Sequence, residues 1–108
     1  MKLQIGETLY DLDYHVNSIC HLEELTGEGI GDVMRKPEMS GLRALLWCGL
    51  IANNKKLTFD QAGDLLEIYL TEHGGYYGAG KDAINVVLAE CIAQAGFLTA
   101  QGTNKEQK

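Results

Sequence analysis

The chain begins with apolar residues at every second position, which is the spacing of a half-buried β-strand. Gly6-Glu7 interrupts this alternation, and glycine suits the first central position of a type II′ turn, where φ is positive. A two-residue turn here would place Ile5 opposite Thr8 and put the apolar residues on one face of a hairpin. Because an isolated hairpin is marginal in water, we expect this face to pack against helices. Its apolar residues are Leu3, Ile5, Tyr10 and Leu12.

Residues 16–26 have apolar side chains at helical spacing, and Gly27, a residue typical of helix C-termini, follows them. After a loop, we expect a short helical turn through Val33 and Met34, which Pro37 closes. The apolar stripe of the first helix consists of Val16, Ile19, Cys20, Leu22 and Leu25.

Three longer helices are predicted in the remainder of the chain. Ser40 is placed to cap the first, and Thr58 and Gln61 have capping-box spacing at the start of the second. The third helix follows a glycine-rich stretch and is stopped by Gly96. The three stripes are Leu42, Leu45, Leu46, Gly49 and Leu50; Ala62, Leu65, Leu66, Tyr69, Leu70 and His73; and Ile84, Val87, Leu88, Cys91, Ile92 and Ala95.

Together these patterns predict an α+β fold that is mainly α, with an N-terminal β-hairpin packed on a bundle of four to five helices. We expect a single domain over residues 1–98, because no linker or internal repeat divides the chain. Residues 99–108 contain almost nothing apolar and are predicted to form a flexible polar tail.

Composition narrows the function classes. The 108 residues carry a formal net charge of −6, and a field of this sign repels the phosphate backbone, so we expect no nucleic-acid partner. No apolar run is long enough for a membrane span, and no signal peptide is apparent. Cys20, Cys48 and Cys91 are odd in number and lack a CxxC pair, which fits a reducing, cytoplasmic setting better than a disulfide framework.

Residues 75–81 read GYYGAGK, which is the spacing of a phosphate-binding loop. Such a loop connects a buried strand to a helix, and a serine or threonine follows its lysine; here a helix is expected before the loop and Asp82 follows Lys81. We therefore interpret the stretch as a connection between two helices, with Gly74 and Gly75 ending the first. A small nucleotide-binding domain with a degenerate loop over Gly75–Lys81 is kept as an alternative.

Residues Leu57–Leu66 are similar to the first helix of a helix-turn-helix. The recognition helix would then begin within residues 74–81, which contain four glycines and one cation. Such a segment has a low helix propensity and too little positive charge to bind phosphates well. A small DNA-binding helical domain is therefore kept only together with the nucleotide-binding alternative.

Three aromatic residues are candidate partner-binding residues. Tyr76 and Tyr77 lie in the glycine-rich stretch, and tyrosines on such segments supply contact area at low entropic cost. Trp47 lies beside the stripe of its helix, where it can form the edge of the core or a partner surface. The alternative for the tyrosines is that one of them folds back onto the core.

We assign no catalytic, cofactor-binding or metal-binding residues. The cysteines lie on or beside apolar stripes, where buried thiols are ordinary core groups and poor thiolates. The cysteines and the histidines, His15, His21 and His73, lack the spacing of a zinc site. Glu23 and Glu24 are adjacent and point about 100° apart on a helix, which argues against a catalytic carboxylate pair.

Four segments carry a family resemblance in the right order: Ile5–Leu12, Leu22–Gly27 (LEELTG), Leu42–Leu50 (LRALLWCGL), and Leu57-Thr58 with Ala62–Leu66 (AGDLL). They resemble the tail assembly chaperones of long-tailed bacteriophages and prophages, including relatives in gene transfer agents. That family opens with a hairpin around a glycine and continues with helices bearing LEELTG, W-x-G-L and a capped LTxxxxGDL segment. The resemblance covers roughly residues 1–69. Glu7 departs from it, because the family often has a basic residue after the hairpin glycine.

The resemblance implies a non-catalytic helper protein that acts in the host cytoplasm. Its expected partners are the tail tube protein and the tape-measure protein, which it would keep soluble and bring together during tail assembly. The finished particle would not contain it. Self-association into a homo-oligomer is left open by the sequence.

Overall fold

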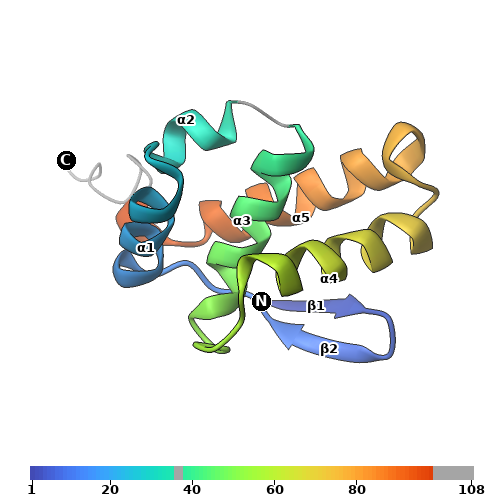
Figure 1. The fold of residues 1–108 in the computed structure, drawn as a ribbon, viewed down its shortest axis with the longest axis horizontal. Coiled ribbons are helices and arrows are strands. Elements are labelled where there is room, and N and C mark those ends of the chain that lie inside the picture. Colours follow the sequence, from blue (N-terminus) through green and yellow to red (C-terminus); the bar gives the residue numbers. More distant parts are fainter. Residues whose placement is uncertain (36–37, 99–108) are drawn as a thin grey trace, which may run out of the picture.

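The computed structural model describes residues 1–35 and 38–98 as a two-stranded antiparallel hairpin followed by five α-helices (Figure 1). The α+β fold class, with the hairpin packed against the helices, is confirmed. Pro37 and the predicted tail over residues 99–108 lie outside the described residues. The elements are β1 (Lys2–Ile5), β2 (Thr8–Asp11), α1 (Val16–Thr26), α2 (Ile30–Met34), α3 (Met39–Ile51), α4 (Phe59–Glu72) and α5 (Lys81–Ala93), with short helical turns at Tyr76–Gly80 and Gly96–Leu98.

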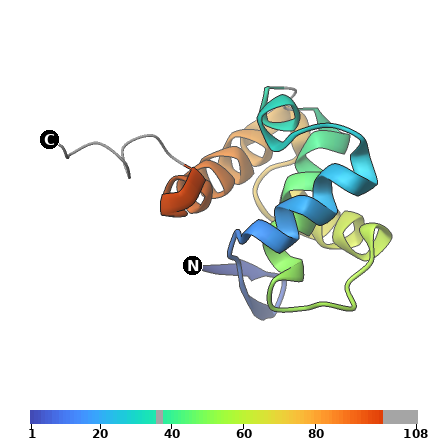
Figure 2. The same ribbon diagram turned by 90° about the vertical axis from the view of Figure 1, so that its left-hand side faces the viewer.

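Helix α3 forms the centre of the bundle and packs against each of the other four α-helices. Figure 1 shows α3 between α1 and α2 on one side and α4 and α5 on the other, and Figure 2 shows α1 crossing it. This central position explains why α3 is buried around most of its circumference. All four leucines of its predicted stripe are buried, and so is Cys48, which only borders that stripe.

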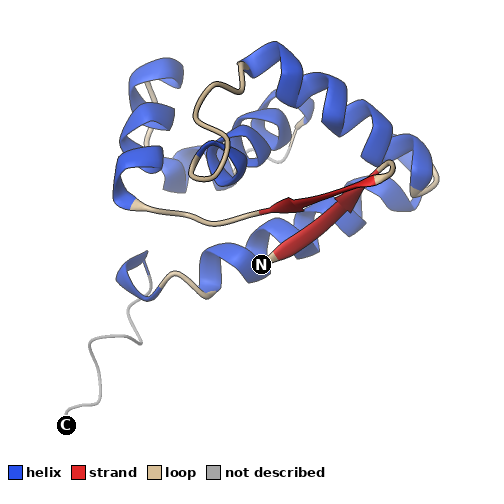
Figure 3. Cartoon of the chain, turned by 90° about the horizontal axis from the view of Figure 1, so that it is seen from below, coloured by secondary structure: helices blue, strands red, loops and turns tan. Residues whose placement is uncertain are grey.

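The hairpin has the predicted register, with Ile5 opposite Thr8, and Gly6 has a φ of +61° as its turn requires. The hairpin runs along the underside of the helices, with β1 against α4 (Figure 3). Its inner face is the one expected: Leu3, Ile5 and Leu12 are buried and Tyr10 is half-buried.

Two residues of the segment after the hairpin, Leu12 and Tyr14, are buried against α3 and α5. Its polar groups are satisfied there, because the Asp13 N–H donates to the carbonyl of Gly49 at 2.9 Å and the Tyr14 hydroxyl donates to the carbonyl of Leu45 at 2.6 Å. A Cβ at Gly49 would lie 2.5 Å from Cδ1 of Leu12, which is fully buried. The glycine in the middle of α3 therefore allows this segment to lie directly on the helix.

Helix α1 has a narrower buried face than predicted. Ile19 and Leu22 are buried, whereas Val16, Cys20 and Leu25 are exposed. The physical reason is that α1 packs against α3 and α2 on one side of the bundle, so its opposite side faces solvent. The predicted stop at Gly27 is confirmed, since this residue adopts the left-handed conformation with a φ of +75°.

The start of α4 is as predicted and the start of α3 is not. Gln61 N–H donates to Thr58 Oγ1 at 3.1 Å and Thr58 N–H donates to Gln61 Oε1 at 2.9 Å, which confirms the capping box. The predicted cap at Ser40 is wrong, because α3 begins at Met39 and Glu38 is its N-cap. Ser40 lies within the first turn and is exposed.

The stripes of α4 and α5 are buried over most of their length. Leu65 and Val87 are half-buried at the edges of these stripes, and His73, predicted to be the last member of the α4 stripe, is exposed. Ala95 lies beyond the end of α5, so Gly96 is not the residue that stops this helix.

Candidate contact surface

The glycine-rich connection between α4 and α5 turns backbone amides inward. Gly74 and Gly75 have φ values of +95° and +88° and end α4 as predicted. The N–H groups of Gly78 and Gly80 both donate to the carbonyl of Gly75, at 3.1 and 3.0 Å. A Cβ at Gly80 would lie 2.7 Å from that carbonyl, so the turn needs a glycine there. A phosphate-binding loop directs such backbone N–H groups at its ligand. Here the N–H groups of Gly78 and Gly80 are already hydrogen-bonded within the turn.

The connection also separates α4 from α5 by residues 73–80. The two helices of a helix-turn-helix are joined by a turn of about three or four residues. The segment Leu57–Leu66 supplies the end of a loop and the first half of α4, in front of a longer connection than that motif uses.

The two tyrosines of the connection have different environments. Tyr76 is half-buried against the core, and Lys81 Nζ lies 5.3 Å from the centre of its ring. Tyr77 is 99% exposed and meets Tyr76 edge to face, with ring centres 5.0 Å apart. Of the pair, Tyr77 is therefore the one that projects a large aromatic surface into solvent.

Trp47 lies at the edge of the core. Its indole N–H donates to the carbonyl of Leu57 at 3.0 Å, and its ring meets Phe59 edge to face at 5.2 Å. These contacts join α3 to the start of α4. The outer part of the ring lines a shallow hollow together with Leu25 and Ile51.

The three thiols are not equivalent. Cys48 and Cys91 are buried, and burial raises the pKa of Cys91 and raises that of Cys48 to about 12. Cys20 is exposed, so its predicted burial is wrong. Glu23 and Glu24 are both exposed. Among residues 1–35 and 38–98, no three His, Cys, Asp or Glu side chains are grouped so that they could hold a metal ion.

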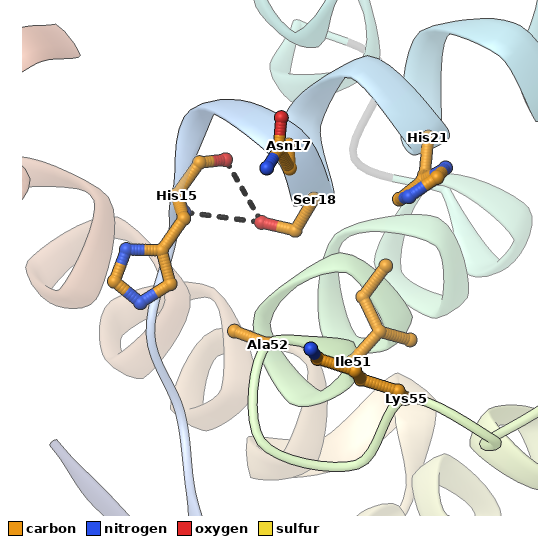
Figure 4. A pocket seen from close by; sticks show the side chains of 7 residues that line it. All are labelled: His15, Asn17, Ser18, His21, Ile51, Ala52 and Lys55. Carbon is orange, nitrogen blue, oxygen red and sulfur yellow. Dashed lines mark hydrogen bonds between the residues drawn. The ribbon is translucent and has the colours of Figure 1, made fainter.

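A groove lies between α1 and the C-terminal end of α3 (Figure 4). One part of it is a hollow of about 400 Å³ with an apolar floor at Ile51 and Ala52. His15, His21 and Lys55 are at its margins. The hollow that contains Trp47 adjoins it and shares His21, Ile51 and Lys55 with it. We call this continuous surface the α1–α3 groove; its lining residues are His15, Asn17, Ser18, His21, Glu24, Leu25, Trp47, Ile51, Ala52 and Lys55.

Ser18 fixes the N-terminal end of the α1–α3 groove. Its hydroxyl donates to the carbonyl of His15 at 2.9 Å and accepts from the N–H of the same residue at 3.0 Å (Figure 4). Ser18 is only 4% exposed, so the entry of the chain into α1 is held in one conformation. The groove therefore has a rigid wall on the α1 side.

A second hollow, of about 570 Å³, lies between the start of α3 and α4. Arg43 crosses its floor, with its guanidinium carbon 4.6 Å from the centre of the Phe59 ring and Nη1 4.0 Å from Oδ1 of Asp60. Tyr76 reaches it from the α4–α5 connection, and Met39, which is 48% exposed, borders it. Tyr76 and Trp47 thus line different hollows, and the three predicted contact residues do not form one site.

The sequence analysis missed the histidines and the lysine of the α1–α3 groove as contact residues. The spacing of His15 and His21 was compared with that of a zinc site alone, and no role was predicted for Lys55. Nothing in their spacing along the chain brings Lys55 to α1, because that proximity depends on how α1 crosses α3. The one available signal was that Lys55 and Lys56 follow an apolar helix without an acidic neighbour.

The chain matches no protein-family model, no curated protein and no solved structure. Within the described residues, no helix combines the length and apolar character that crossing a membrane would need.

Proposed function

We propose that this protein is a non-catalytic tail assembly chaperone of a phage or prophage. It binds the tail tube protein, the tape-measure protein or both in the host cytoplasm during tail assembly. The proposal starts from the four segments whose order and sequence resemble that family, and the packing of those segments supports it.

The observation that carries the proposal is a set of contacts that join one of these segments to another. Gly49 of the W-x-G-L segment receives Leu12 from the hairpin segment. Trp47 of the same segment hydrogen-bonds the carbonyl of Leu57, where the LT segment begins. The resemblance thus falls on the residues that specify one fold, which is the expected behaviour of a family pattern.

The exposed apolar side chains support a protein that acts through contact. Leu25, Met39 and Tyr77 are 53%, 48% and 99% exposed, and each lies beside one of the hollows or on the α4–α5 connection. Exposed apolar groups bordered by polar residues are typical of surfaces that bind other proteins.

Co-expression tests the proposal. The chain is produced together with the tail tube protein and the tape-measure protein encoded beside it, and the soluble fraction is purified through a tag on the chain. We expect at least one of the two proteins to gain solubility and to co-purify in a stoichiometric complex. If both remain unbound and their solubility is unchanged, the proposal is wrong.

The nucleotide alternative predicts a different outcome. A nucleotide that binds only the folded chain would raise its melting temperature as the ligand concentration increases. Thermal unfolding with increasing Mg²⁺-ATP therefore separates the two functions, and we expect no change in the melting temperature.

A further inference from the structure

The lysine and arginine side chains of this acidic protein differ in whether a carboxylate lies close to them. Among the described residues, three basic side chains lie within 4.0 Å of a carboxylate and a fourth stacks on an aromatic ring; they are Lys2, Arg35, Arg43 and Lys81. Lys55 and Lys56 are exposed, and among the described residues no carboxylate lies within 4.0 Å of either ammonium group. Both lie in the loop between α3 and α4. Of the three described lysines without a carboxylate partner, two therefore lie in one loop, and one of these two, Lys55, borders the α1–α3 groove.

Two histidines face the same groove from α1. His15 and His21 line the hollow that Lys55 borders, and Figure 4 shows Lys55 extending across the end of α3 towards α1. Glu24 is the one carboxylate among the described residues that line the groove, and its Oε1 lies 3.7 Å from Nδ1 of His21. The first turn of α1 contains no acidic residue, so the partial positive charge at this helix end is not neutralised locally. Lys55 and the two histidines thus offer N–H donors to a carboxylate at the groove, and Lys55 carries a full positive charge.

The floor of the groove is apolar. Ile51 and Ala52 line the hollow that Lys55 borders. Leu25 and Trp47 continue the apolar surface into the adjoining hollow. Leu25 is a leucine of a helical stripe, yet it is 53% exposed. A surface with apolar side chains at its centre and charge at its rim is organised like a protein interface.

We propose that the α1–α3 groove binds an acidic, amphipathic segment of a partner protein. Apolar side chains of the segment cover Ile51 and Leu25, and its carboxylates pair with Lys55 and accept N–H hydrogen bonds from the histidines at the rim. The identity of the partner as a tail protein rests on the proposed function, whereas the chemistry of the segment rests on the groove. The apolar floor and the single lysine at the rim favour a peptide over nucleic acid, whose binding relies on many phosphate contacts.

A matched pair of peptides tests the chemistry without any tail protein. Both peptides have about 14 residues with leucines at helical spacing; glutamates fill the other positions of one and lysines those of the second. Each is titrated into the ¹⁵N-labelled chain at low salt. We expect the acidic peptide to shift the amide signals of Ser18, His21 and Lys55, and the basic peptide to leave them unchanged. Equal shifts with both peptides, or none in the groove, would overturn the proposal.

Charge reversal then tests the groove in the complex with the tail proteins. Lys55→Glu changes an exposed rim residue, and we expect about tenfold weaker binding at low salt. Lys2→Glu makes the same change of net charge at an exposed residue of the hairpin, outside the groove, and should leave the affinity within about twofold. If the wild-type chain binds and both variants bind equally well, the groove proposal fails while the proposed function stands. If the wild-type chain binds neither protein, the proposed function fails, and the peptide titration still decides the groove.

The oligomeric state decides between a partner and a second copy. We expect the wild-type chain and the Lys55→Glu variant to have the same mass in solution by light scattering. A wild-type oligomer that Lys55→Glu dissociates would assign the groove to self-association and overturn the proposal.

Discussion

Gly49 provides the sharpest test of how the resembling segments pack together. The Gly49→Ala substitution adds a methyl group that would lie 2.5 Å from Cδ1 of Leu12 and 3.1 Å from Cζ of Tyr14. An ordinary contact between carbon atoms needs about 3.5–4.0 Å, so Leu12 has to move by roughly 1 Å. Leu12 is fully buried, and Tyr14 is held by its hydrogen bond to the carbonyl of Leu45. Neither side chain can move away without disturbing the core.

Two opposing effects set the size of the change. Overpacking a close-packed core costs about 1–3 kcal/mol, and two buried side chains at one site place this case at the upper end of that range. Replacing glycine by alanine inside a helix stabilises by about 1 kcal/mol. We therefore expect Gly49→Ala to lower the free energy of unfolding by about 2 kcal/mol.

Gly63→Ala is the matched control, because Gly63 is also a glycine inside a helix of the resembling segments. Its added methyl group meets Cδ of Arg43 at 3.2 Å, and the long Arg43 side chain, which is 37% exposed, can shift. We expect this variant to be as stable as the wild type or up to about 1 kcal/mol more stable. Urea unfolding followed by circular dichroism measures both variants. The reasoning is refuted if Gly49→Ala is at least as stable as the wild type, or if both variants lose the same stability.

Further predictions follow from the helix caps, the thiols and the exposed tyrosine. Thr58→Ala should lower the free energy of unfolding by about 1 kcal/mol, whereas Ser40→Ala should leave it unchanged in the same urea titration. Cys20 should react with a thiol reagent in the folded protein at neutral pH, and Cys48 only after unfolding. The folded pKa of Cys48, about 12, exceeds the unfolded value near 9, so the folded state retains the proton longer. Stability should therefore fall as pH rises above 9, by up to about 1.4 kcal/mol per pH unit from this thiol, and less in Cys48→Ala. Tyr77→Ala should leave the melting temperature unchanged and weaken binding of the tail proteins; unchanged affinity would remove Tyr77 from the contact surface.

Local patterns were sufficient for much of the fold. The period of two around Gly6 determined the hairpin register, because one turn geometry satisfies both the backbone and the apolar face. The capping box at Thr58 was equally predictable, since its two hydrogen bonds join residues only three positions apart. Ser40 has the same cap chemistry, but α3 starts two residues earlier than a cap at Ser40 would place it, so the choice between neighbouring start sites was not encoded in that residue.

The candidate site depended on packing over longer distances and was only partly predictable. Leu25 belongs to an apolar stripe and is nevertheless exposed, because α1 lies at the side of the bundle and buries a narrow face. The stripe of α1 gave no indication of how many helices would cover it. For the same reason, the proximity of Lys55 to His21 could not be predicted before the crossing of α1 and α3 was known. Trp47 was correctly placed at the edge of the core, because it lies beside a stripe.

Hydrogen–deuterium exchange of the chain, alone and mixed with the tail tube or tape-measure protein, tests the central claim most directly. The claim is that the resembling segments pack into one core and that the α1–α3 groove on its surface makes the contacts. We expect a complex in which exchange slows at residues 15–28 and 52–57, around the α1–α3 groove, while the hairpin exchanges as it does in the free chain. The absence of any slowed exchange with either protein, or slowing confined to the hairpin and α4, would contradict this account.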